Sequence, residues 1–214
     1  MKIKHGKNFC IKDKRSVFID QTVSIGDNVT IYENNRIEGC TTICDGAVIM
    51  PNCHIKNAYI GEKSVINCSQ LEDCAIGNDC TIGPFARLRP KAHLFNKVKI
   101  GNFVEIKNAT IGENTKVSHL AYVGDADLGK DCNIGCGAIF VNYNGKTKSR
   151  TTVGDGCFIG SNCNIIAPVN IASKSYICAG TTITENVETD DFVIGRVRQQ
   201  VKQNRAHEYL KGNN

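Results

Sequence analysis

Aliphatic side chains recur at every sixth position along most of this chain of 214 residues. The first run of isoleucines keeps the interval without a break, and its members are Ile19, Ile25, Ile31, Ile37, Ile43, Ile49 and Ile55. A period of six does not match the 3.6 residues of an α-helical turn, but it is a multiple of the two-residue repeat of a β-strand. The pattern therefore predicts short strands whose aliphatic anchors share one interior.

The repeat continues, with occasional five-residue steps, as far as Ile183. Its later anchors include Ile76, Ile82, Leu88, Leu94, Ile100, Ile106, Val153, Ile159, Ile165, Ile171 and Ile177. Hexapeptide repeats indicate a parallel β-helix, in which three flat faces close one coil of about 18 residues. We predict an all-β hexapeptide-repeat solenoid. Its left hand follows from a general resemblance to hexapeptide-repeat proteins, because the rule for parallel crossovers would predict the opposite hand.

The periodicity divides the chain into three parts. Residues 1–18 show no clear period and are expected to form a lead-in segment, followed by the β-helix over residues 19–194. Between Phe140 and Val153 there are thirteen positions where six are due. The excess, residues 144–151, is polar and cationic, and predicts a loop that protrudes from the solenoid. Residues 195–214 are basic and rich in helix formers, so we expect a short helix or an arm that docks on the solenoid and caps its open end.

Composition narrows the cellular setting and the partners. Five of the twelve cysteines follow an anchor by four positions, where a small apolar side chain is needed: Cys53, Cys80, Cys132, Cys157 and Cys163. We expect buried free thiols and hence a cytoplasmic protein. No apolar run of about 18 residues could span a membrane, and the polar start does not resemble a signal peptide. The net charge of +5 suits anionic small molecules, while the absence of like-charge blocks argues against nucleic acid.

His119 is the strongest candidate for chemistry. It follows the anchor Val117 by two positions, and Glu105 and Lys107 precede it by 14 and 12 positions, on a neighbouring face or coil. A carboxylate beside a histidine raises its basicity and fixes its tautomer, as a general base requires. A metal site of three convergent histidines is not expected, since only His93 lies in the same region. The absence of a Cys-x-x-Cys pair also argues against zinc.

Several segments carry a more specific resemblance. They are GPFARLRP (83–90), GNFVEIKNA (101–109), SHLAYVGDA (118–126), NIGCG (133–137), VNYNGKTK (141–148) and IGSN (159–162). From about residue 19 to about residue 198, the chain resembles the acetyltransferase domain of the bifunctional glucosamine-1-phosphate acetyltransferase/N-acetylglucosamine-1-phosphate uridylyltransferase family. The family's nucleotidyltransferase domain has no counterpart here, so we expect no uridylyltransferase activity from this chain.

The resemblance implies acetyl transfer from acetyl-CoA to the amine of glucosamine 1-phosphate, for UDP-N-acetylglucosamine and cell-wall synthesis. His119 would be the general base, Glu105 would orient it, and Asn133 would hold the amine or the sugar. The residues implied for binding the sugar phosphate are Arg89, Lys107, Tyr122, Asn133 and Lys148. Those implied for acetyl-CoA are Cys136 through its backbone N–H, Asn142, Tyr143, Ser161, Ala179 and Arg196.

The family also implies a homotrimer with active sites between subunits, and it admits a separate uridylyltransferase as a partner. Three positions depart from the family pattern: Asn144 stands where Asp is usual, Arg198 where Pro is common, and Cys136 where Ala is frequent. The first two affect the expected contacts of the loop and the tail.

Two other functions remain open at this stage. One is N-acetylation of another amino sugar, for example a nucleotide-linked one. The other is a non-catalytic β-helix that serves as an assembly module. The combination of His119, Glu105 and Arg89 argues against the second alternative, because a scaffold needs none of them.

Overall fold

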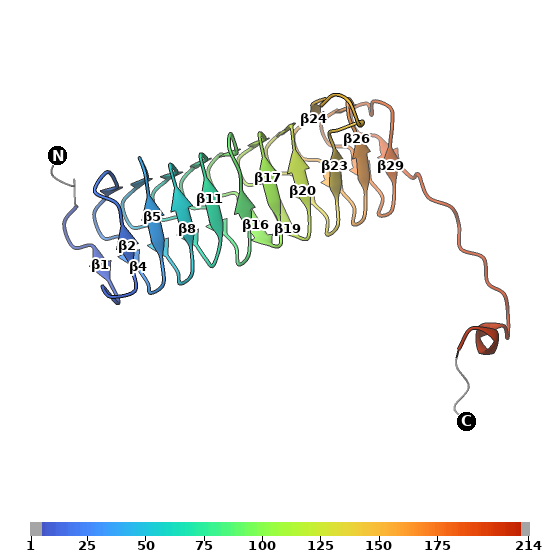
Figure 1. Cartoon of the computed structure of the whole chain (residues 1–214). Coiled ribbons are helices and arrows are strands. Elements are labelled where there is room, and N and C mark those ends of the chain that lie inside the picture. Colours follow the sequence, from blue (N-terminus) through green and yellow to red (C-terminus); the bar gives the residue numbers. More distant parts are fainter. Residues whose placement is uncertain (1–5, 211–214) are drawn as a thin grey trace.

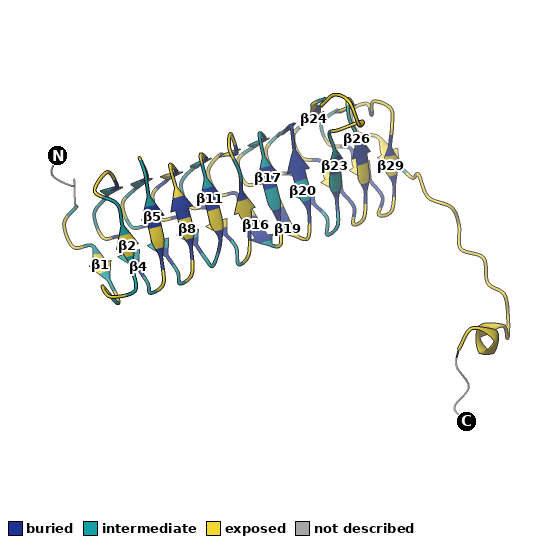
Figure 2. Cartoon of the chain, in the orientation of Figure 1, coloured by how far each residue is buried: buried dark blue, intermediate teal, exposed yellow. Residues whose placement is uncertain are grey.

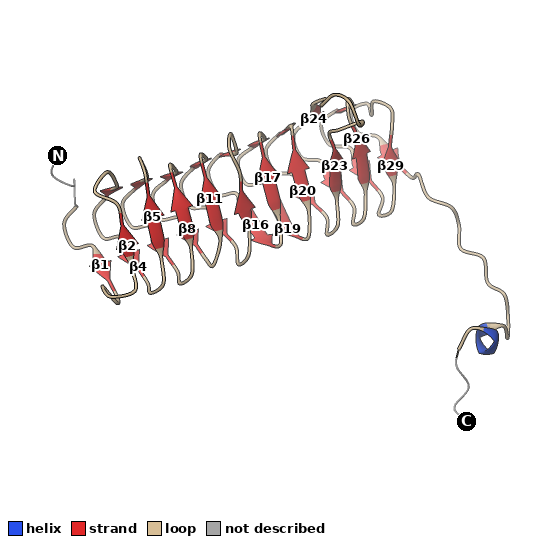
Figure 3. Ribbon diagram, viewed as in Figure 1, coloured by secondary structure: helices blue, strands red, loops and turns tan. Residues whose placement is uncertain are grey.

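The chain winds into a solenoid of short parallel strands in a computed structural model that describes residues 6–210 (Figure 1). Consecutive strands belong to three different sheets in rotation, so a strand pairs with the one that follows it by three, as β10 does with β13. Strands and short turns make up nearly all of the described chain (Figure 3). The all-β parallel solenoid expected from the six-residue period is therefore confirmed.

Each sheet forms one face of the solenoid. The first face contains β1 (Cys10–Ile11), β4 (Thr30–Ile31), β7 (Val48–Ile49), β10 (Val65–Ile66), β13 (Thr81–Ile82), β16 (Lys99–Asn102), β19 (Lys116–His119), β22 (Asn133–Ile134), β25 (Phe158–Ile159), β28 (Tyr176–Ile177) and β30 (Phe192–Val193). The second face contains β2 (Phe18–Ile19), β5 (Arg36–Glu38), β8 (His54–Lys56), β11 (Gln70–Glu72), β14 (Arg87–Leu88), β17 (Glu105–Lys107), β20 (Tyr122–Gly124), β23 (Ile139–Val141), β26 (Asn164–Ile166) and β29 (Thr182–Ile183). The third face contains β3 (Ser24–Ile25), β6 (Thr42–Ile43), β9 (Tyr59–Ile60), β12 (Ala75–Ile76), β15 (His93–Leu94), β18 (Thr110–Ile111), β21 (Ala126–Leu128), β24 (Thr151–Val153) and β27 (Asn170–Ile171).

The anchors fill the interior, and Figure 2 shows buried residues in dark blue along the strands of the solenoid. The anchors Ile25, Ile31, Ile37, Ile82, Ile134 and Ile159 are all at most 3% exposed. Neighbouring coils place anchor on anchor, as in the pair Ile66 and Ile82. Burying one such side chain contributes about 1.5–3 kcal/mol. The repeated ladder is therefore the main source of stability, and the buried anchors predicted from the period are confirmed.

Cysteines occupy the small interior positions beside the anchors. The five cysteines singled out by their spacing are all at most 2% exposed, and all twelve are free thiols. Their sulfur atoms lie near backbone carbonyls, as Cys163 Sγ does at 3.2 Å from the carbonyl oxygen of Cys178. Burial raises the pKa of Cys53 to about 11 and that of Cys74 to about 12. Cys53 and Cys74 thus remain protonated and pack as small apolar groups.

The solenoid begins earlier than the expected boundary at residue 19. Strand β1 pairs with β4 through Cys10 and Thr30, inside the range expected to be a lead-in segment. Ile11 and Val17 are partly buried against the core. The repeat was hidden because eight residues, rather than six, separate Ile11 from the next anchor, Ile19. Residues 1–5 of the expected segment lie outside the described part of the chain.

The C-terminal arm leaves the solenoid instead of docking on it. After β30 the chain extends away from the coils and ends, within the described residues, near the short 3₁₀-helix η1 (Ala206–Glu208) (Figure 1). Val197 is 95% exposed and Val201 is 73% exposed. These two apolar side chains stand among cationic and amide residues, so the arm has little apolar surface to bury against the solenoid. The expected cap over the open end is therefore not formed by the arm of this chain.

The predicted loop lies where the six-residue period fails. The chain departs after β23 at Val141 and rejoins the third face at Thr151, the first residue of β24. Residues 143 and 148 form an antiparallel bridge, so the loop is a small hairpin that projects from the solenoid near β24 (Figure 1). Within residues 6–210, no helix is long and apolar enough to cross a membrane.

Candidate active site

His119 lies at the corner where the chain turns from the first face to the second, here called the first corner. The strand register places it opposite Asn102, and its Nδ1 lies 2.6 Å from Oδ1 of that residue. An amide oxygen can only accept a hydrogen bond, so Nδ1 must carry the proton and donate. In the neutral ring, Nε2 is then the unprotonated nitrogen. The pair therefore presents His119 in the tautomer that can accept a proton.

Within the described chain, Glu105 forms no hydrogen bond with His119, contrary to the expected pairing. Its carboxylate accepts a hydrogen bond from Nη1 of Arg89 at 2.7 Å, and this bond raises the pKa of the guanidinium. The reason is the length of the coil. The residue stacked on His119 lies 17 positions earlier, at Asn102, whereas Glu105 is already on the second face. Sequence reasoning missed Asn102, although a count of one coil length would have found it.

A column of predicted acetyl-CoA residues continues from His119 along the first corner. The anchors Val117, Ile134, Ile159 and Ile177 are stacked by the strand register. The residues two positions after these anchors form the corner column: His119, Cys136, Ser161 and Ala179. Backbone bonds of 2.8 Å join Asn162 N–H to the Cys136 carbonyl and Gly180 N–H to the Ser161 carbonyl. Arg196 extends the corner column, donating from Nη1 to the Ala179 carbonyl at 3.0 Å.

The backbone N–H of Cys136 is available to a ligand. Among residues 6–210, the structure gives it no hydrogen-bond acceptor, although its carbonyl is paired. It lies one coil beyond His119 in the corner column. A free N–H group beside a proton acceptor is suited to stabilising negative charge on a carbonyl oxygen under attack.

Cationic side chains gather at the other edge of the second face. Arg89, Lys107 and Lys148 are here called the cation cluster; Arg89 follows β14, Lys107 ends β17 and Lys148 belongs to the hairpin. Lys107 and Lys148 are close enough that the second ammonium group, followed by burial, lowers the pKa of Lys107. Two adjacent ammonium groups repel each other in the absence of an anion. The cation cluster is thus an arrangement that favours an anionic ligand such as a phosphate.

Asp125 holds side chains at this edge of the second face by hydrogen bonds. Its buried carboxylate accepts hydrogen bonds from the side-chain amides of Asn108 and Asn142. Burial acts to raise the pKa of Asp125, but these bonds and the nearby lysines hold it below its usual value. The amide of Asn142 also lies 3.4 Å from the hydroxyl of Tyr122. Asn142 and Tyr122 therefore lie at the same edge as the cation cluster.

The hairpin tolerates its departure from the family pattern at position 144. The side-chain oxygen of Asn144 accepts from the N–H groups of Lys146 at 2.9 Å and Thr147 at 2.8 Å. Asparagine supplies the same acceptor oxygen as the usual aspartate, without its negative charge beside Lys148. Tyr143 is exposed and donates its hydroxyl to the carbonyl of Gly145 at 2.7 Å.

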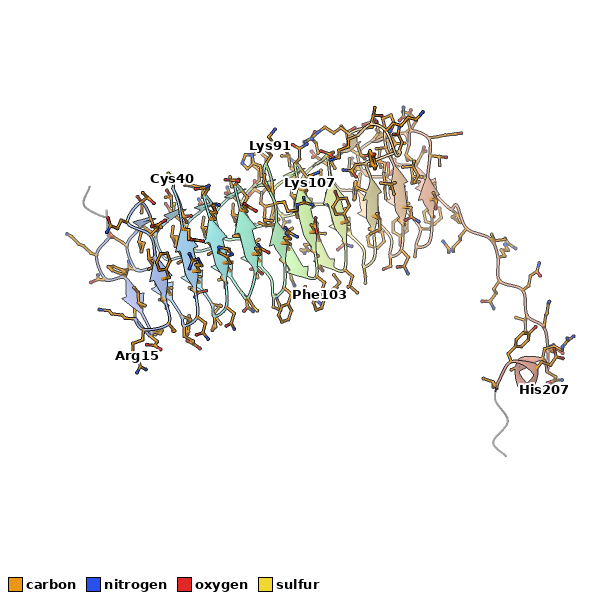
Figure 4. All side chains as sticks on the ribbon, in the orientation of Figure 1. Arg15, Cys40, Lys91, Phe103, Lys107 and His207 are labelled. Atoms are coloured by element: carbon orange, nitrogen blue, oxygen red, sulfur yellow. The ribbon has the colours of Figure 1, made fainter. Side chains whose placement is uncertain are left out.

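Within one chain, the predicted residues form two groups rather than one site. The corner column lies at one edge of the second face, and the cation cluster lies at the other edge. Figure 4 shows the labelled Phe103 and Lys107 at these opposite edges, before and at the end of β17. Asn133 belongs to neither group, because it lies in β22 on the first face, opposite Lys116 and Phe158.

An apolar ridge runs along the first corner beside His119. Phe85, Phe103 and Leu120 are 55%, 56% and 55% exposed, and the rings of the two phenylalanines stack with centroids 5.3 Å apart. All three have a positive φ, of 59°, 56° and 48°. Bulky residues rarely adopt this conformation, which asparagine and glycine accept more easily. Exposed apolar side chains at such positions indicate a surface that is covered in the working protein.

No group of three or more His, Cys, Asp or Glu residues that could hold a metal ion occurs within residues 6–210.

Sequence comparison matches this chain with bifunctional proteins over most of its length. Bifunctional protein GlmU of Levilactobacillus brevis is 50% identical over 192 residues, which make up 90% of this chain and 42% of that protein. Bifunctional protein GlmU of Geobacillus thermodenitrificans is 46% identical over 201 residues, covering 94% of this chain and 44% of the relative. This chain is a relative of GlmU. The resemblance noted in its motifs is confirmed, and the chain spans less than half the length of the GlmU proteins it matches.

Two further comparisons concern the repeat and the fold. Residues 150–185 match the family model described as the hexapeptide repeat of succinyl-transferase. LpxA from Bacteroides fragilis, a UDP-N-acetylglucosamine acyltransferase, gives a TM-score of 0.56 over 83% of this chain and 69% of that chain, at 18% identity. At that identity the likeness concerns the fold alone, which is the predicted left-handed parallel β-helix.

Proposed function

We propose that this chain is an N-acetyltransferase that moves an acetyl group from acetyl-CoA to the amine of glucosamine 1-phosphate. The observation that carries the proposal is the corner column, in which His119 in its proton-accepting tautomer precedes Cys136, Ser161 and Ala179. The relationship to GlmU supports the same reaction. A base next to a free backbone N–H is what attack of an amine on a thioester requires.

In the proposed reaction, the amine nitrogen attacks the carbonyl carbon of the thioester. Nε2 of His119 accepts the proton that the amine loses, and the N–H of Cys136 stabilises the negative charge on the carbonyl oxygen. The carbon–sulfur bond then breaks, and CoA leaves as a thiol after taking up a proton. General base catalysis contributes about 10²–10⁴-fold, and one oxyanion donor about 10²–10³-fold.

The sugar phosphate would bind through the cation cluster. Arg89 is a planar fork that matches two phosphate oxygens, whereas Lys107 and Lys148 act as point charges. The hydroxyl of Tyr122 would contact the sugar, and Asn133 would hold the amine or the sugar. Asn142, Tyr143 and Arg196 would line the acetyl-CoA channel.

We further propose that the working site forms between copies of the chain in a homotrimer. Five residue steps separate Asn102, the register position of His119, from Lys107, and this chain length reaches at most about 17 Å. A single sugar phosphate would have to bridge this span within one chain. A second copy that packs on the apolar ridge would place the cation cluster of one subunit beside His119 of the other. Closed cyclic symmetry would complete three such sites.

The proposed product, N-acetylglucosamine 1-phosphate, would be used for UDP-N-acetylglucosamine and cell-wall synthesis by a separate uridylyltransferase. We place the reaction in the cytoplasm. The twelve free thiols support a reducing compartment.

The test is release of free CoA thiol from acetyl-CoA by the purified chain. Release that depends on glucosamine 1-phosphate, and not on glucosamine 6-phosphate, is expected. Release only with a nucleotide-linked amino sugar would replace the proposed substrate, and no release with any amino sugar would favour an assembly module. Analytical ultracentrifugation of the same sample tests the trimer, which a Phe103→Asp substitution in the apolar ridge should dissociate.

A further inference from the structure

The exposed side chain of Arg150 makes four hydrogen bonds to earlier parts of the chain. It stands immediately before β24, where the hairpin rejoins the solenoid. Its Nε and Nη2 atoms donate to the two carboxylate oxygens of Asp127. Its Nη1 donates to the carbonyl of Asn108 at 3.0 Å, and Nη2 lies 3.3 Å from the carbonyl of Ala126. One guanidinium group thus ties the hairpin to residues of two earlier coils.

The hairpin itself is held together by local bonds. Asn144 caps the turn through the two N–H groups described above, and Ser149 N–H donates to the Asn142 carbonyl at 2.9 Å. The segment is therefore a single hydrogen-bonded unit that is attached to the solenoid at two stems. The first stem is Asn142, which Asp125 holds by a hydrogen bond. The second stem is Arg150.

Electrostatic repulsion acts to open this arrangement. The hairpin carries Lys148 against Lys107, and the two ammonium groups have the same charge. Asp125 lies nearby but already accepts bonds from Asn108 and Asn142. Without a firm second stem, the lowest-energy response of the ligand-free protein would be to swing Lys148 away from Lys107.

We propose that Arg150 is a positioning residue that latches the hairpin to Asp127, so that Lys148 and Lys107 converge on a single phosphate. The identification of that phosphate as the sugar phosphate rests on the proposed function. In the latched state, the repulsion between the two lysines is present before binding and is relieved when the dianion arrives. Because a doubly charged phosphate relieves this repulsion and an uncharged sugar does not, the latched protein binds the phosphate in preference.

The latch stays closed at neutral pH. The hydrogen bond from Arg150 holds the pKa of Asp127 below its usual value, despite opposing burial, and Asp127 in turn raises the pKa of Arg150. Both partners therefore keep their charges throughout the range in which an amine acetyltransferase would work.

The kinetic test compares Arg150→Ala, Lys148→Ala and the double variant. Arg150→Ala is expected to raise the KM for glucosamine 1-phosphate about tenfold and to change kcat less than threefold. Because Arg150 acts through Lys148, its removal should have little further effect when Lys148 is already alanine. Arg150→Lys keeps the charge but loses the fork, so it should restore only part of the affinity. The latch would be overturned if the fold change in KM of the double variant equalled the product of the fold changes of the two single variants.

Arg15→Ala is the matched control, since Arg15 forms an exposed pair with Asp13 at the far end of the solenoid. Its kinetics should equal those of the wild type. A second readout does not require turnover: hydrogen exchange of the amides in residues 143–149 should speed up in Arg150→Ala and not in Arg15→Ala. Unchanged exchange in Arg150→Ala would overturn the latch even if glucosamine 1-phosphate proved not to be the substrate. Absence of turnover of glucosamine 1-phosphate by the wild type would count against the proposed function alone and not against the latch.

Discussion

Nδ1 of His119 donates to the side-chain oxygen of Asn102 across 2.6 Å, and the two residues lie opposite each other in neighbouring coils. An amide oxygen selects the tautomer of the ring without adding charge beside it. A carboxylate in the same place would also favour the protonated ring and would raise its pKa. The amide therefore selects the neutral tautomer whose Nε2 can accept a proton, which suits a base.

This relationship predicts the effect of Asn102→Asp. A carboxylate within hydrogen-bond distance should favour the protonated form of His119. A base works only when unprotonated, so activity falls below its pKa, and the acidic limb of the kcat/KM profile should move to higher pH. The pH profile of glucosamine 1-phosphate acetylation measures this shift. Asn28→Asp, an exposed corner position remote from His119, should leave the profile in place; an unmoved limb in Asn102→Asp would exclude His119 as the titrating group.

Removal of the base should affect turnover and spare the cofactor. We expect His119→Ala to lower kcat by at least about 10²-fold, because the amine must lose its proton as it attacks. Binding of acetyl-CoA should be nearly unchanged, since His119 acts on the amine and not on the thioester carrier. Calorimetric titration with CoA and steady-state kinetics separate the two effects. Near-normal turnover at neutral pH would assign proton removal to solvent or to the phosphate of the substrate.

Arg89→Ala should change the KM rather than kcat. Charge-assisted bonds to a phosphate exist in the ground state and the transition state alike, so their loss weakens binding without slowing the chemical step. We expect the KM for glucosamine 1-phosphate to rise about tenfold or more. Arg36→Ala provides the control. Arg36 lies on the same face, several coils away from Arg89, and is paired with Glu38. A fall in kcat at unchanged KM would remove Arg89 from phosphate binding.

The fold was predictable from the sequence because a single interior selects the same residue type at each sixth position. The anchors, the small cysteine positions and the protruding loop all follow from that repetition. The eight-residue step between Ile11 and Ile19 hid the first strand, since one irregular coil carries no period. The arm could not be placed from composition, because docking depends on a surface to bury rather than on helix propensity.

The site was only partly predictable for a related reason. Side chains that meet across coils are separated by the local coil length, which is 17 residues between Asn102 and His119 and not a fixed number. Counting 14 positions back led to Glu105, which the structure pairs with Arg89. The ties of Arg150 to Asn108 and Asp127 span 42 and 23 residues, so they depend on where the hairpin rejoins the third face.

Phe140 provides the test of the core. It is the largest of the fully buried side chains and lies in β23 opposite Ile165, at the coil from which the hairpin departs. Replacing a buried phenylalanine with alanine typically costs about 3–5 kcal/mol, because apolar contact is lost and a cavity remains. Phe192 has the same side chain but is 65% exposed and only stacks on Tyr176 at 5.2 Å, so Phe192→Ala should cost less than about 1.5 kcal/mol. Thermal unfolding followed by circular dichroism measures both.

A solenoid coil contacts only its neighbours, so the damage from Phe140→Ala should be local before it is global. Hydrogen exchange should rise first in β20, β23 and β26, which flank the cavity, while β5 and β8 at the other end of the stack keep their protection. Asn142, the first stem of the hairpin, lies two residues after Phe140, so the hairpin amides should also exchange faster. Equal losses of stability in Phe140→Ala and Phe192→Ala would contradict the stacked interior as the source of stability.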